Sequence, residues 1–174
     1  MLSRRQLLKT GLGGTAVLAL ATLLASPQPD GPAEDWAKPL KLRALTPRDA
    51  QLLAAIAPGV LGAGVAPPED VVRGVDRAVA GLPPAMRAEL RQLLDLLGNP
   101  WGRRWIAGVS APWRQASVED IEAFLRRWRG SVFPLLRSGY QALHQLLNAA
   151  WYGNPASWPA LGYRQPAAVM EMLP

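Results

Sequence analysis

Few side chains in this sequence of 174 residues could carry out chemistry: there is one histidine and no cysteine. Thiolate nucleophiles, disulfides and cysteine-ligated metals are therefore excluded, and one histidine cannot build a multi-histidine metal site. His144 lies on a polar stripe of a predicted helix, with no carboxylate three or four residues away. We therefore predict that it is a solvent-exposed side chain rather than a general base, with a partner contact as the alternative.

The carboxylates and glycines also lack a catalytic pattern. The pairs Glu69-Asp70 and Glu119-Asp120 each fall in the first turn of a predicted helix, where the helix dipole favours negative charge. The glycine-rich run at residues 11–14 follows no predicted strand, so it does not fit a dinucleotide-binding loop. The sequence predicts no catalytic, cofactor-binding or metal-binding residues in this chain, and no enzyme activity.

Tryptophan and arginine are concentrated between residues 99 and 116, a segment whose glycines and prolines predict irregular structure. These residues are Trp101, Arg103, Arg104, Trp105, Trp113 and Arg114. Tryptophan and arginine are the types most enriched in interface hot spots, which makes this segment a candidate partner interface. The alternative is that the rings cover a thin core. Single-stranded nucleic acids are bound by the same residue types, but an exported protein rarely meets them, so we expect no nucleic-acid partner.

Apolar residues recur at helical spacing in several segments, and no alternation typical of a sheet is present. Thr46 and Ser117 are each followed three residues later by an aspartate, which predicts capped helix starts. The last segment, from about residue 131 to 152, has the widest apolar stripe, in which we include Val132 and Phe133, and is predicted to be the central helix. The sequence therefore predicts an all-α fold, a small bundle of about five helices.

The first residues predict an export signal. Arg4 and Arg5 precede two leucines and Lys9, and a weakly apolar stretch follows that is shorter than the ~20 residues of a membrane-spanning helix. This pattern is typical of the twin-arginine route, which carries folded proteins to the periplasm. Leu23 is unfavourable for cleavage after Ala25, so retention at the inner membrane stays an alternative. We predict these units: a twin-arginine signal peptide (1–27), a linker (28–44), a helical domain (45–166) and a C-terminal tail (167–174).

The net charge of +6 is shared between the signal and the rest of the chain. Arg4, Arg5 and Lys9 supply three of these charges, so the remainder has 16 basic and 13 acidic residues, a net charge of +3. This excess is too small to favour nucleic-acid binding.

Four short motifs occur in a suggestive order: LTPRD at 45–49, GLPP at 81–84, WRGS at 128–131 and PASWPALGY at 155–163. With the twin-arginine start, the chain resembles the gluconate 2-dehydrogenase subunit 3 family. Trp158 and Tyr163 belong to the closing motif, which is the most specific of the four, and they complete the candidate partner interface.

The resemblance implies a non-catalytic small subunit. Such subunits accompany a large FAD-dependent oxidoreductase of the glucose-methanol-choline type, often with a cytochrome c subunit. The large subunit commonly lacks an export signal and would travel with this chain through the twin-arginine translocase. FAD is then expected in the partner and not here. The alternative is a stand-alone periplasmic helical binding module, with or without a membrane tether.

Overall fold

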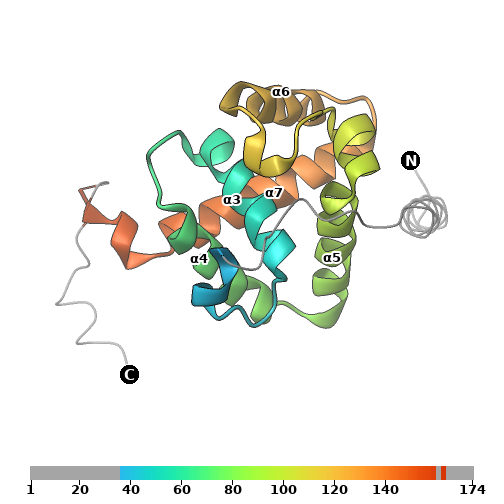
Figure 1. Ribbon diagram of the computed structural model, residues 1–174. Helices are drawn as coiled ribbons and strands as arrows, with labels where there is room; N and C mark the ends of the chain where they lie inside the picture. The colour runs from blue at the N-terminus through green and yellow to red at the C-terminus, as the bar shows by residue number, and fades with distance from the viewer. Residues whose placement is uncertain (1–35, 160–161, 164–174) are drawn as a thin grey trace, which may run out of the picture.

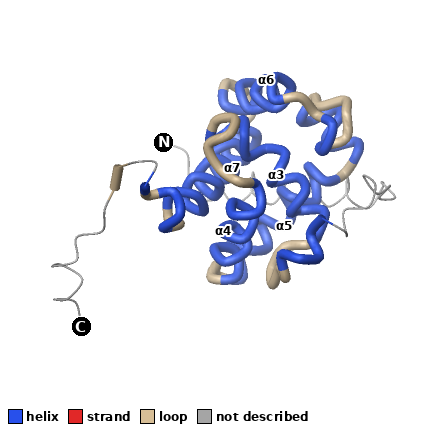
Figure 2. Tube along the Cα trace, turned by 60° about the vertical axis from the view of Figure 1, so that its left-hand side comes forward, coloured by secondary structure: helices blue, strands red, loops and turns tan. Residues whose placement is uncertain are grey.

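The computed structural model describes residues 36–159 and 162–163, and this part of the chain is helical without any strand (Figures 1 and 2). The predicted all-α bundle is confirmed. The predicted signal peptide (1–27) and C-terminal tail (167–174) lie outside the described residues. The helices are α3 (Pro47–Leu61), α4 (Pro68–Ala80), α5 (Pro84–Gly98), α6 (Val118–Arg129) and α7 (Pro134–Tyr152). Four short helical segments accompany them: η1 (Lys38–Leu40) before α3, η2 (Gly102–Ala107) and η3 (Trp113–Gln115) between α5 and α6, and η4 (Pro155–Ser157) after α7.

Helix starts follow the local sequence closely. The Thr46 hydroxyl accepts a hydrogen bond from the backbone N–H of Asp49, whose carboxylate accepts from the N–H of Thr46 at 2.7 Å. Ser117 and Asp120 form the same reciprocal arrangement at the start of α6. Each arrangement satisfies two backbone donors that a helix start leaves unpaired, which is why both starts could be predicted from sequence.

The central helix is α3. The sequence prediction that the last helix is central was wrong. Helix α3 lies in the middle of the other helices (Figure 1) and contacts α4, α5, α6, α7 and η3. Its Leu53 and Ile56 are fully buried. The predicted stripe of the last helix included Val132 and Phe133, but α7 begins only at Pro134. These two side chains therefore precede the helix, and both are exposed. Proline favours the first helical position, which fixes this start.

Part of the predicted linker is folded onto the bundle. Ala37 and Leu40 are buried in the core, so the chain is packed from at least residue 36 onward. The reason is a long-range contact: the buried carboxylate of Asp76 in α4 accepts the backbone N–H groups of residues 43–45 at 2.9 to 3.1 Å. Three successive N–H groups around one carboxylate tie this segment to α4.

Aromatic rings fill the space between α6 and its neighbours. Phe124 packs edge-on against Trp128, with ring centroids 4.9 Å apart. Gly139 of α7 allows the ring of Trp128 to approach, because a Cβ atom there would lie 2.5 Å from Trp128 Cζ3. Protein cores are close-packed, so this contact fixes how near α6 and α7 lie.

A partly buried ion pair links α3 to α5. Asp49 is 4% exposed, and its two carboxylate oxygens accept from both terminal nitrogens of Arg91. The hydrogen bond that Arg91 donates to Asp49 raises the pKa of Arg91, and this outweighs the opposite effect of burial. Arg91 also pairs with Asp95 at 3.1 Å.

No helix in the described part of the chain is long and apolar enough to cross a bilayer.

Candidate interaction surface

The segment between α5 and α6 is more ordered than its glycines and prolines predict. It contains the π-helix η2, the left-handed Gly108 that ends it, and η3. Gly102 lies against the backbone carbonyl of Leu96, where a Cβ atom would clash, so the first turn of η2 packs directly on α5. The irregular interpretation of residues 99–116 was therefore wrong for much of the segment. Short π-helices are rare, and their apolar spacing differs from that of the α-helical template.

This packing places two of the predicted interface residues in the protein interior. Trp113 is 2% exposed, donates its Nε1–H to the carbonyl of Leu97 at 2.8 Å, and packs edge-on against Phe124. Arg103 is 8% exposed. The ring of Trp113 therefore covers the core, which was the alternative to an interface role.

Trp101 and Trp105, in contrast, are on the surface. Their side chains are 65% and 70% exposed, and their rings stack with centroids 6.4 Å apart and planes 21° apart. Arg104 between them is exposed, as is Arg114 in η3. Two large exposed rings in contact form an apolar patch of the kind that marks an interaction site.

Three further exposed apolar side chains were missed by the sequence interpretation: Val132, Phe133 and Leu135, at the link between α6 and α7. The end of α6 is tied to η2, because Trp128 Nε1 donates to the carbonyl of Ile106 at 3.1 Å and Arg127 donates to that of Ala107. In Figure 1 the α6–α7 link runs beside the yellow-green segment that follows α5. Pro134 was the available signal, since the residues before a proline at a helix start lie outside that helix.

The exposed apolar residues of η2 and of the α6–α7 link lie in two stretches of sequence that contain arginines and no acidic residue. No acidic residue occurs between Asp95 and Glu119, or between Glu122 and Glu171. The same two stretches contain eight arginines: Arg103, Arg104, Arg114, Arg126, Arg127, Arg129, Arg137 and Arg164. Arg126 pairs with Glu122 at 3.5 Å, whereas the bonds from Arg127 and Arg137 that hold the fold go to backbone carbonyls, which leave the positive charge uncompensated.

The closing motif lies elsewhere on the molecule. Trp158 donates its Nε1–H to the carbonyl of Tyr152 at 3.2 Å and packs edge-on against Tyr163, whose side chain is 50% exposed. Both follow the end of α7, whereas Phe133 precedes its start, and 19 residues at about 1.5 Å each separate the two ends by about 28 Å. Figure 1 shows the orange-red end of the described chain extending away from the bundle, on the side opposite η2. The predicted interface residues therefore do not form one surface.

His144 is exposed, as predicted. It lines a shallow hollow of about 170 Å³ with residues that include Glu122, Arg129 and Tyr140. The carboxylate comes from α6, so a search along the helix of His144 could not find it. Glu122 is engaged by Arg126, and no group of three metal-binding side chains occurs in the described residues.

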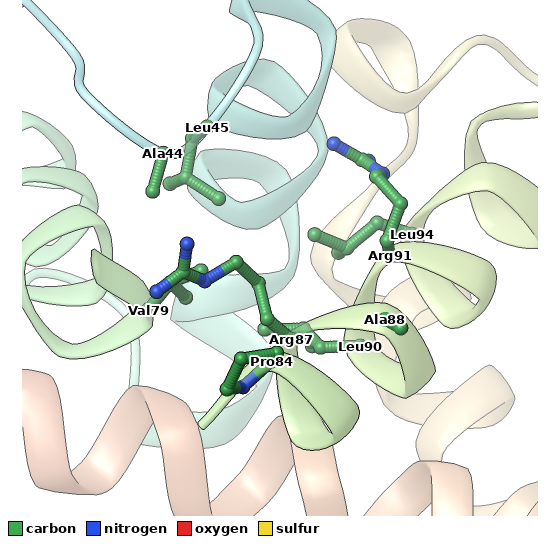
Figure 3. Close-up of a pocket in the computed structure, with 9 residues that line it drawn as sticks. All are labelled: Ala44, Leu45, Val79, Pro84, Arg87, Ala88, Leu90, Arg91 and Leu94. Carbon is green, nitrogen blue, oxygen red and sulfur yellow. The ribbon is translucent and has the colours of Figure 1, made fainter. Parts of the chain in front are cut away.

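A larger cavity of about 320 Å³ lies between α4, α5 and the segment before α3 (Figure 3). Its walls are mostly apolar and include Leu45, Val79 and Leu94. The Arg87 guanidinium reaches across it, in Figure 3, but is engaged by the carbonyls of Ala80 and Leu82 at 2.9 and 3.1 Å. The cavity therefore offers apolar contact and little directed polar recognition.

Comparison with protein-family models, with curated proteins and with solved structures finds no match to this chain. Function is therefore inferred from the residues, from the surface that they build and from the motifs described above.

Proposed function

We propose that this chain is the non-catalytic small subunit of a periplasmic FAD-dependent dehydrogenase of the glucose-methanol-choline type, which oxidises a sugar or alcohol. Its role is to stabilise the large subunit and to carry it through the twin-arginine translocase. The observation that carries the proposal is the stacked, exposed pair Trp101 and Trp105 within an arginine-rich and well-packed segment.

Exposed tryptophans of this kind favour a partner of protein size. Each ring buries about 150–250 Å² when covered. At 65% and 70% exposure, covering both would remove roughly 270 Å² from water, worth about 7 kcal/mol as an upper estimate at about 25 cal/mol per Å². A rigid presentation lowers the entropy cost of binding, which supports a docking role for this segment.

Two sequence features support this class of partner. The twin-arginine route carries folded proteins. Since this chain has no recognisable cofactor loop of its own, export of a folded, flavin-loaded partner would explain why it carries a twin-arginine signal. The four motifs resemble those of small subunits that accompany such flavoenzymes. The substrate and the electron acceptor are properties of the partner.

The proposal predicts that a large flavin-dependent oxidoreductase is encoded by a neighbouring gene, and co-expression with that protein tests it. We expect a stoichiometric complex, FAD bound to the large subunit, and periplasmic accumulation of both chains. The double variant Arg4→Lys/Arg5→Lys should keep both in the cytoplasm, because it removes the shared signal. Equal folding, flavin content and export of the large subunit without this chain would refute the proposal.

The second candidate is a stand-alone periplasmic binding module, and the apolar cavity between α4 and α5 favours it. Purification of the native protein without a stoichiometric partner, but with an apolar small molecule bound, would support this function instead. Leu94→Trp would then fill the cavity and displace that molecule.

A further inference from the structure

We propose that η2 and the α6–α7 link together form the surface that docks the large subunit, and that the matching surface of the partner is apolar at its centre and acidic at its edge. This inference rests on the proposed function and adds the place and chemistry of the contact. The surface, here called the docking face, consists of Trp101, Trp105, Ile106, Val132, Phe133 and Leu135.

The two segments of the docking face are held together by bonds that do not involve its exposed side chains. The indole of Trp128 is buried and bonds to the carbonyl of Ile106, and Arg127 bonds to the next carbonyl, that of Ala107. Arg137 of α7 donates to the carbonyl of Ser131 at 2.7 Å and so holds the link from the other side. The backbone that carries the docking face is therefore fixed before any partner binds, which lowers the cost of ordering it.

The apolar content of the docking face is large for an uncovered surface. Val132 is 82% exposed, Phe133 65% and Leu135 52%, in addition to the two stacked tryptophans. Aromatic residues are enriched at the cores of protein interfaces. Single exposed apolar residues need no explanation, but six on two connected segments indicate a surface that is covered in the assembled protein.

The charge around the docking face selects the occupant. Arg104 lies between the two tryptophans and Arg129 ends α6. Residues 96–118 and 123–170 contain no carboxylate, and the acidic side chain that lines a hollow with Arg129 is Glu122, which Arg126 engages. A second copy of this chain would bring the same positive charges together, and like charges oppose that contact. An acidic surface on a different chain would be attracted instead.

A protein surface fits better than an anionic membrane. Every basic residue after Lys41 is an arginine, and this residue type, together with tryptophan and phenylalanine, characterises protein interfaces, where lysine is depleted. Arginine also pairs with carboxylates through two parallel hydrogen bonds, whereas a membrane surface attracts lysine and arginine alike.

The test uses the full chain with the large subunit and measures the dissociation constant. Trp101→Ser/Trp105→Ser and Arg104→Glu/Arg129→Glu should each weaken binding by about a hundredfold or more, the loss expected from removing hot-spot residues or reversing complementary charge. The matched control is Val65→Ser/Met86→Ser, because these side chains are exposed by 46% and 54% but belong to other parts of the bundle. We expect the control to bind like the wild type. Equal thermal unfolding of all variants would show that they remain folded.

Each other outcome contradicts a defined part of the inference. If the wild type does not bind the large subunit, the proposed function fails together with the inference. If the wild type binds and both docking-face variants bind equally well, the inference alone fails. If the docking-face variants lose wild-type binding to vesicles of phosphatidylglycerol and phosphatidylcholine but still bind the large subunit, the docking face belongs to a membrane contact and the inference is overturned. A wild-type homodimer that the tryptophan substitutions dissociate, again with the complex intact, would assign it to a second copy.

Discussion

Removal of the Asp76 carboxylate should detach the segment before α3 from the bundle. The side chain is 5% exposed, and its oxygens accept from the N–H groups of Arg43, Ala44 and Leu45. These donors are 31 to 33 residues away in sequence, so no local structure replaces them. Asp76→Asn keeps the shape and one acceptor, but presents an amide donor to a backbone donor. Asp76→Ala removes all of the acceptors.

The expected cost follows from the number and type of these bonds. A hydrogen bond to a charged group contributes about 1.5–3 kcal/mol, and a buried donor left unpaired costs about 1–3 kcal/mol. We therefore expect about 2 kcal/mol for Asp76→Asn and about 4 kcal/mol for Asp76→Ala, since water reaches part of the freed segment. The latter would be a large share of a total stability of about 5–15 kcal/mol.

Urea unfolding of the purified variants measures these free energies, and hydrogen exchange of the Ala44 and Leu45 amides locates the effect. The control is Asp70→Asn on the same helix: Asp70 bonds to Arg73 at 3.2 Å and is 36% exposed, so its loss should cost less than about 1 kcal/mol. Equal stability of the Asp76 and Asp70 variants, or unchanged protection of the two amides, would refute this account of the segment.

Two further substitutions test the packing of the bundle. Gly139→Ala should destabilise the protein by about 1–3 kcal/mol, because its methyl group would overlap the ring of Trp128, whereas Gly98→Ala has open space and should be neutral or stabilising in the same thermal-unfolding series. Arg91→Met should cost about 3–5 kcal/mol, because it leaves the buried carboxylate of Asp49 without its cation. Because the pKa of Arg91 is raised, the stabilisation by the Arg91–Asp49 ion pair is present below the ordinary arginine pKa and is lost only in more alkaline solution. If the stability difference between wild type and Arg91→Met fell between about pH 6 and pH 9, this assignment of the ion pair would be contradicted.

The helices and their starts could be predicted because their causes are local. Thr46 and Ser117 reach donors within one turn, and the prolines before α4 and α5 act on their own backbone. The exposed state of His144 also followed from the polar stripe around it.

The candidate interaction surface could be predicted only in part. The tryptophan and arginine types drew attention to residues 99–116, but type alone could not separate the buried Trp113 from the exposed Trp101. That separation depends on the π-helical turn and on the carbonyl of Leu97, which is available only because α5 ends nearby. The sequence predicted Phe133 to belong to the apolar stripe of the last helix because its spacing continues that stripe, but α7 begins only at Pro134 and the Phe133 side chain is exposed.

The sequence by itself determined the all-α class, the capped helix starts and the scarcity of groups able to do chemistry, because these depend on residue type and on contacts within one turn. The tertiary structure alone decided which residues come together from a distance. It made α3 the central helix, bound residues 43–45 to Asp76, and placed the α6–α7 link beside η2 through the indole of Trp128. The physical reason is that burial and buried hydrogen bonds are satisfied by whichever groups the whole chain brings near, and sequence spacing does not record that distance.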